Sequence, residues 1–168
     1  MQFNSLRDVL QEQLEDILSA ENQLVEALPK MANATSSDEL RKAIEEHLEE
    51  TRGHVQRVQD ALGELGVSSS STVCEGMKGL IEEGDEVVQA TGDDLAKDAA
   101  LIAAAQRVEH YEIAAYGTAR QLADDLDLGG IRDLMDQTLD EESQADKLLT
   151  KIATGGMFRS GVNEQAAS

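Results

Sequence analysis

Aromatic residues, proline and cysteine are nearly absent from this sequence. Aromatic side chains make up 2% of the 168 residues, with no tryptophan and a single proline, although hydrophobic residues make up 40%. The core must therefore be built from Ala, Leu, Ile, Val and Met, which suits closely packed helices better than a β-sheet. A chain of this length fits one domain with a substantial core. The composition predicts an all-α protein.

The sequence also lacks the features of an exported or membrane-spanning protein. Cys74 is the single cysteine, so an intrachain disulfide framework is excluded. The amino-terminal segment has neither the basic start nor the apolar run of a signal peptide. No stretch approaches the roughly 18 consecutive apolar residues that cross a membrane. We therefore expect a soluble, cytoplasmic protein with no membrane partner.

Basic residues are scarce relative to acidic ones. The chain has 14 Lys and Arg against 34 Asp and Glu, a formal net charge of -20. Nucleic acid is excluded as a partner, because phosphate contacts need clustered Lys and Arg. The acidity fits either a surface adapted to high salt or a cation-handling function. The acidic residues are spread along the whole chain, which favours the halophilic interpretation.

Hydrophobic periodicity and turn residues divide the chain into four long helices and one short helix. The predicted helices span residues 5–31, 37–65, 75–90, 94–126 and 131–154. Tight turns within the first and last pairs of long helices make antiparallel neighbours, and the long connection between the pairs carries the short helix. This order predicts a ferritin-like four-helix bundle with one long crossover. We expect one bundle domain over residues 1–154 and a loosely held tail over 155–168.

Three local features mark the ends of the first two helices. Asn4 or Ser5 is the expected N-cap of the first helix. Pro29 should kink or close that helix near its end. Ser36, followed by Glu39, fits a capping box at the start of the second helix.

Glutamates interrupt the apolar stripes of three long helices. Each stripe follows spacings of three and four residues and is apolar almost throughout. Near the middle of each stripe, a glutamate takes the place of a core residue: Glu21, Glu112 and Glu142. On the second helix the best stripe passes through Leu48, Thr51 and Val55, and Glu50 flanks it. We expect Glu50 to lean inward beside His47 and His54.

Buried carboxylates at one level of a bundle need a positive partner. A lone one would cost several kcal/mol or take up a proton, and several together repel each other strongly. No Lys or Arg lies on the three interrupted stripes. Two metal ions would neutralise the cluster, and carboxylate oxygens with some imidazole suit iron first and manganese second. The alternative is a structural role, in which the glutamates share protons or contact buried water.

Two helices carry similar acidic segments. Glu49, Glu50 and Thr51 are matched by Glu141, Glu142 and Ser143, and a further candidate ligand follows the second glutamate by four residues. That candidate is His54 in the first segment and Asp146 in the second. A spacing of four keeps both side chains on one helix face. The repeat suggests that two similar hairpins each contribute half of a di-metal site.

Several stretches together resemble a known family. They are SAENQLVEALPKMA, HLEETRGHVQRV, CEGMKGLIEEG, ALIAAAQRVEHYEIAAYGTARQLA and LDEESQADKLL, which cover most of the chain. In these stretches the chain resembles the YciE/YciF-type ferritin-like proteins, which are associated with bacterial stress responses and related to rubrerythrins. The resemblance implies a ferritin-like bundle, a homodimer and a di-iron-like ligand set of Glu21, Glu50, Glu109 or Glu112, and Glu142. The Glu-x-x-His motif typical of such sites is absent.

These observations leave two functions open. The first is a metal-dependent oxidoreductase or iron-handling protein, with Glu109, His54 and Asp146 as changeable ligands. The second is a non-enzymatic dimeric stress protein that acts by binding a protein partner and carries an idle metal site; a storage cage is a weaker third. No catalytic triad, phosphate-binding loop or zinc-finger spacing occurs, and no catalytic residue is assigned. Structural roles are expected for Cys74, His110, Tyr111 and Tyr116.

Overall fold

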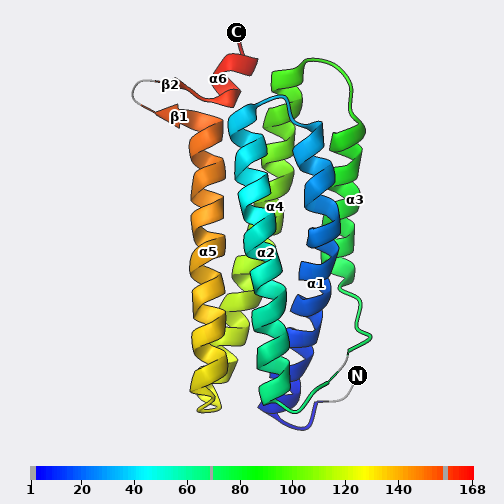
Figure 1. Cartoon of the computed structure of the whole chain (residues 1–168), viewed down its shortest axis with the longest axis vertical. Coiled ribbons are helices and arrows are strands. Elements are labelled where there is room, and N and C mark those ends of the chain that lie inside the picture. Colours follow the sequence, from blue (N-terminus) through cyan, green and yellow to red (C-terminus); the bar gives the residue numbers. More distant parts are fainter. Residues whose placement is uncertain (1–2, 69, 157–158) are drawn as a thin grey trace.

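A computed structural model describes residues 3–68, 70–156 and 159–168. Four long helices run the length of the molecule, and a shorter helix, α3, lies along the outside of α1 and α4 (Figure 1). The bounds of these helices are α1 Leu6–Ala34, α2 Asp38–Glu64, α3 Glu75–Gln89, α4 Asp94–Asp125 and α5 Gly129–Thr154. The all-α, ferritin-like four-helix bundle predicted from the sequence is confirmed.

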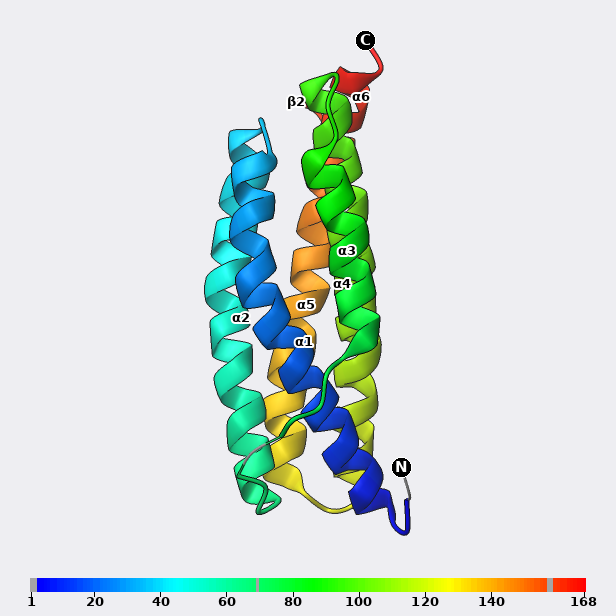
Figure 2. The same ribbon diagram turned by 90° about the vertical axis from the view of Figure 1, so that its right-hand side faces the viewer.

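The bundle consists of two antiparallel helix pairs, α1 with α2 and α4 with α5. Figure 2 shows the first pair on one side and α4 on the other, with α5 seen between them and α3 in front of α4. Helix α3 runs toward the end of the bundle where α1 and α2 are joined, so that α4 starts at that end (Figure 1). This is the long crossover that the sequence predicted.

The start of α1 follows the sequence prediction, whereas the turn after it does not. Ser5 is the N-cap of α1 and forms a capping box with Asp8. The helix does not close at Pro29 but continues to Ala34. Ser37, rather than the predicted Ser36, caps α2, because its side chain accepts a hydrogen bond from the Leu40 amide.

The turn between α1 and α2 is held by a buried carboxylate from α4. Asp98 is fully buried and accepts four hydrogen bonds, from Thr35 Oγ1 and Ser36 Oγ at 2.6 Å each, from the Ser36 amide at 3.0 Å and from the Ser37 amide at 2.8 Å. Burial alone would raise the pKa of Asp98, but these hydrogen bonds lower it below its ordinary value. Asp98 thus links the two helix pairs at this end of the bundle. Because the Ser36 hydroxyl donates to Asp98, Ser36 does not cap α2.

The carboxyl-terminal residues pack on the bundle, so the expectation of a loosely held tail is wrong for them. Two short strands, β1 (Gly155–Gly156) and β2 (Arg159–Ser160), pair antiparallel and lead into α6 (Val162–Ala166). Val162 is 5% exposed and belongs to the apolar core. A Cβ on Gly161 would lie 2.3 Å from the Ala153 carbonyl oxygen, so only glycine permits this approach.

The apolar core is divided into two clusters by a polar level. One cluster contains Leu24, Ile44 and Leu101, and the other contains Leu14, Val58 and Ile131. On every long helix the residues between the two clusters include buried polar side chains. In the described part of the chain, no helix is long and apolar enough to span a membrane.

Candidate metal centre

Six buried ionisable side chains from the four long helices form the polar level. Glu21 comes from α1 and Glu142 from α5, whereas α2 and α4 each supply two residues. The set is completed by His47, His54, Glu109 and Glu112, and none of the six residues is more than 7% exposed. The three glutamates that interrupt the predicted stripes therefore do meet at one depth. The predicted candidates Glu109 and His54 join them.

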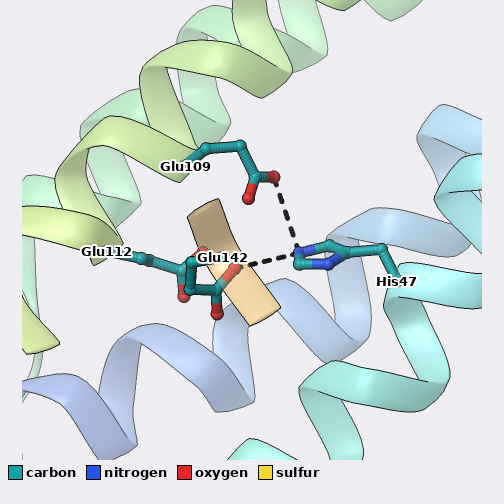
Figure 3. A group of neighbouring side chains, drawn as sticks. All are labelled: His47, Glu109, Glu112 and Glu142. Atoms are coloured by element: carbon teal, nitrogen blue, oxygen red, sulfur yellow. Dashed lines mark ion pairs between the residues drawn. The ribbon is translucent and has the colours of Figure 1, made fainter. Parts of the chain in front are cut away.

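The six side chains form two groups that share Glu142. One contains His47, Glu109, Glu112 and Glu142 (Figure 3). The other contains Glu21, His54 and Glu142. Within each group, one ligand atom per residue lies within 4.8 Å of the others. The two oxygens of Glu142 face different groups, with Oε2 lying 3.8 Å from His47 Nε2 and Oε1 lying 2.9 Å from His54 Nδ1.

The inward face of α2 carries His47 and His54, of which only His54 was predicted as a ligand and neither lay on the predicted stripe. Its buried stripe runs through Ile44, His47, Thr51, His54 and Val58, rather than through Leu48 and Val55. His47 and His54 are two helical turns apart and so point the same way. The spacings of three, four, three, four and three from Ile44 to Ala61 could have revealed this stripe. The apolar alternative looked better because it avoided two polar residues.

Buried polar atoms without hydrogen bonds are concentrated at this level. Within the described residues, each buried side-chain nitrogen or oxygen that lacks a hydrogen bond belongs to one of the same six residues. These atoms are Glu21 Oε2, both ring nitrogens of His47, His54 Nδ1, Glu109 Oε2, and both carboxylate oxygens of Glu112 and Glu142. Buried polar atoms are normally satisfied, and exceptions need an explanation. Nine exceptions in one place, all of them metal-ligating atoms, fit cation binding.

The orientation of the His54 ring is fixed by Glu141 and Arg57, which are not among the six buried residues. Its Nε2 lies 2.9 Å from Glu141 Oε2, and Arg57 donates two hydrogen bonds to Glu141, at 2.6 and 2.9 Å. His54 Nδ1 therefore faces inward, 2.9 Å from Glu142 Oε1 and 3.5 Å from Glu21 Oε1. A carboxylate that holds the outer nitrogen of a histidine is typical of metal-ligating histidines. In the sequence, Glu141 is distinguished only as part of a repeat, and no pattern marks Arg57.

The outer nitrogen of His47 also lies near a carboxylate, that of Glu50, which is more exposed to solvent than Glu141 is. Its Nδ1 lies 3.5 Å from Glu50 Oε2, and its Nε2 lies 3.5 Å from Glu109 Oε1 and 3.8 Å from Glu142 Oε2 (Figure 3). The Glu50 side chain is 49% exposed and lies outside both groups. The expectation that Glu50 leans inward is therefore wrong, because the histidines occupy the inward face of α2. Glu50 contacts the outer nitrogen of His47 instead.

Asp146 also lies outside both groups. Its carboxylate accepts a hydrogen bond from Gln106 Nε2 at 3.0 Å and lies 3.4 Å from Nε2 of His110. These contacts turn Asp146 toward the outer surface between α4 and α5. His110 is exposed, as expected.

Three effects shift the pKa values of the cluster: burial, repulsion between the glutamates, and attraction between the glutamates and the two histidines. Burial raises the pKa of Glu109 to about 8 and also raises the pKa values of Glu112 and Glu21. Burial would lower the pKa of His47, but Glu109, Glu50 and Glu142 raise it to about 9. Glu142 and Glu21 outweigh burial in the same way and raise the pKa of His54 to about 10. Bound cations would replace protons at these atoms.

Two tyrosines lie near the cluster and differ in their relation to it. Tyr116 is fully buried, and its hydroxyl donates a hydrogen bond to Glu21 Oε1. Burial raises the pKa of Tyr116 well above its ordinary value, so the hydroxyl remains a donor. Tyr111 instead donates to Asp16 Oδ2 at 3.0 Å, and its oxygen lies 3.0 Å from the sulfur of Cys74. Cys74 is buried and belongs to neither ligand group.

Comparison with known proteins matches nearly the whole chain to one protein family. A family model described as "Domain of unknown function (DUF892)" matches residues 5–167. Protein YciF of Escherichia coli (strain K12) is 42% identical over 165 residues, which is 98% of this chain and 99% of that protein. The crystal structure of the E. coli stress protein YciF has a TM-score of 0.86 at 44% identity, covering 89% of this chain and 94% of that one.

Two further solved structures share the fold. YcfI from Rhodopseudomonas palustris has a TM-score of 0.86 at 37% identity, covering 89% of this chain and 96% of that one. A dodecameric thioferritin, the bacterioferritin-related protein from Bacteroides fragilis, has a TM-score of 0.68 at 19% identity, covering 86% and 84%. At that identity the likeness concerns the fold alone.

Proposed function

The chain belongs to the family described as a domain of unknown function, DUF892, and we propose that it is a di-metal carboxylate protein that handles iron or peroxide in a stress response. The observation that carries this proposal is the set of nine buried ligand atoms without a hydrogen bond at one level, arranged in two groups around Glu142. The stress context comes from the relative YciF, which is described as a stress protein.

The ligand set divides between two cations. His47, Glu109 and Glu112 would hold one ion and Glu21 and His54 the other, with Glu142 shared. Five carboxylates and two imidazoles, counting Glu142 once for each ion, are hard and intermediate ligands that suit iron or manganese. When bound, such a pair supplies single-electron steps to oxygen or peroxide. The assignment omits Glu50 and Asp146, which lie outside both groups, and adds His47.

The residues around the ligands have separate tasks. Glu141, fixed by Arg57, keeps Nδ1 of His54 free for a metal, and Glu50 does the same for Nε2 of His47. The Tyr116 hydroxyl holds one oxygen of Glu21 and leaves the other free. The apolar clusters on either side of the level exclude water and strengthen the interactions within it. The homodimer and the cytoplasmic location expected from the sequence are retained as parts of this proposal.

Metal content per chain tests the proposal. Protein purified without chelators and then loaded under anaerobic conditions should contain about two iron or manganese ions per chain by elemental analysis. Glu142→Gln should lose stoichiometric binding of both ions, because it removes the shared ligand. Asp140→Asn, an exposed change on the same helix, should retain both. A folded wild-type chain without stoichiometric metal would instead favour the partner-binding stress protein with an idle site.

A further inference from the structure

A cavity of about 280 Å³ lies directly beside the candidate metal centre. It lies among α1, α2, α4 and α5, and His47 and Glu109 line it. Both of these residues carry unpartnered buried atoms. Ligand sites are typically cavities with apolar walls and a few polar groups that fix orientation. The cavity joins such walls to the ligand groups of the centre.

The walls of this cavity are apolar in its depth and polar at its mouth. Leu28, Ile44, Ala105 and Leu149 are buried residues that line the depth. The exposed lining residues come from α2 and α5, which are adjacent in Figure 1; they are Glu46, Glu50, Gln144 and Leu148. A molecule could therefore enter between α2 and α5 and reach His47 and Glu109 from the side. At ~30 Å³ per water-sized atom, the cavity has room for about nine non-hydrogen atoms.

The charge of the lining selects among ligands. Among the residues that the structure describes, four glutamates line the cavity, Glu46, Glu50, Glu109 and Glu141, and no Lys or Arg does. In the metal-free protein the carboxylates of the lining outnumber the one cationic side chain, His47, so an organic anion would be repelled and would lose its hydration against apolar walls. A cation would meet the same apolar walls and, in the loaded protein, two positive ions. An uncharged molecule incurs none of these costs.

We propose that this cavity is the substrate pocket of the centre and binds an uncharged organic molecule with a short alkyl or aryl group. Its apolar part packs against Leu28, Ile44 and Leu149, and its polar end faces His47 and Glu109. The occupant's role as a substrate rests on the proposed function, whereas its binding does not. Binding and metal content are therefore measured separately on the same samples.

Octan-1-ol and octanoate are the matched test ligands, because they share an alkyl chain and differ in charge. Each is titrated into metal-free and metal-loaded protein and followed by ¹H–¹⁵N NMR. In the metal-free protein, octan-1-ol should give saturable shifts at Leu28, Ile44 and Leu149, and octanoate should bind at least about tenfold more weakly, a difference of about 1.4 kcal/mol. Octanoate that binds metal-free protein as tightly as octan-1-ol, or shifts that do not saturate there, would overturn the proposal.

Cavity-filling variants locate the binding site. Ala145→Leu and Ala43→Leu each place extra carbon atoms in the lining and should weaken octan-1-ol binding at least about tenfold. Ala114→Leu, an exposed change on α4, should bind as the wild type does. Circular dichroism confirms folding, and two filling variants guard against the misfolding of one. Unchanged binding in a folded filling variant would overturn the proposal.

The outcomes for the pocket and for the centre can be told apart. A protein that takes up two metal ions but shows no saturable octan-1-ol site would refute the substrate pocket alone. A protein that binds octan-1-ol in this cavity without stoichiometric metal would refute the proposed function and the occupant's role as its substrate. Binding at this position would then stand as a ligand site in its own right.

Discussion

The buried carboxylate of Glu112 lacks hydrogen bonds that meet normal geometry, so its replacement by leucine should stabilise the metal-free form. The residue is 2% exposed, and neither carboxylate oxygen has a hydrogen-bond partner. Burial, together with the charges of Glu142, Glu21 and Glu109, raises its pKa well above the ordinary value. Leucine is similar in size and has no polar atoms to satisfy.

The magnitude follows from the two unpartnered oxygens. An unsatisfied buried polar group costs about 1–3 kcal/mol, and replacing buried charged groups by apolar ones of similar volume can stabilise by about 1–4 kcal/mol. Allowing for imperfect packing of the branched side chain, we expect a gain of about 2 kcal/mol for Glu112→Leu. For a domain of this size, that gain corresponds to a rise in Tm of about 4–8 °C.

The assay compares thermal unfolding with a chelator and with added iron or manganese. In chelator, Glu112→Leu should unfold at a higher temperature than the wild type. With metal the order should reverse, because a ligand present at 100 times its Kd adds about 2.7 kcal/mol per site to the wild type alone. The control is Glu26→Leu, which is exposed on α1 and should change stability by no more than about 0.5 kcal/mol in either condition.

Two results would refute this reasoning. If Glu112→Leu is destabilised in chelator by as much as an ordinary core substitution, the carboxylate is satisfied in the metal-free protein. If the variant and the wild type gain equally from metal, Glu112 does not belong to the ligand set.

Three further predictions concern the surroundings of the centre and the fold. Glu141→Gln removes the carboxylate that orients His54 and should lower metal affinity about 10–100-fold without changing stoichiometry, as measured by anaerobic titration. The pKa of Asp98 is depressed below its ordinary value of 3.8, so its stabilisation is present above about pH 4 and is lost as pH falls through the folded pKa. Asp98→Asn should therefore cost about 1.5–3 kcal/mol at pH 7 and progressively less toward pH 3, measured by urea unfolding; an equal cost at both pH values would contradict the assignment. Gly66 has a φ of +81°, so Gly66→Ala should cost about 1 kcal/mol, whereas Gly63→Ala within α2, where a Cβ meets nothing within 4 Å, should stabilise by about 0.5–1 kcal/mol.

The sequence was sufficient to predict the architecture and most of the buried centre. The spacings around Glu21, Glu112 and Glu142 predicted three carboxylates at one depth, because each replaced a core residue near the middle of a regular stripe. The short turns and the long crossover then defined the topology. These features are local and periodic, so they can be read from the chain without knowledge of its contacts.

The sequence was not sufficient to predict the orientation of α2 and the contacts that depend on tertiary structure. The apolar stripe through Leu48 and Val55 is nearly as regular as the one through His47 and His54. The choice between them depends on carboxylates from other helices, which favour imidazole on the inward face. Glu50 was misplaced as a consequence of this error.

Two contacts distant in sequence explain the remaining differences. Asp98 holds the turn between α1 and α2, so Ser37 rather than Ser36 caps α2. Val162 packs into the core and anchors the end of the chain. Neither contact leaves a periodic pattern in the sequence.

The most direct test of the account is a crystal structure of the metal-loaded protein, with anomalous scattering measured at the absorption edge of the loaded metal. We predict two anomalous peaks about 3.5–4 Å apart, both within coordination distance of Glu142, with Nδ1 of His54 on one ion and Nε2 of His47 on the other. A fully loaded crystal with one peak, or with peaks away from Glu142, would contradict the bridged pair.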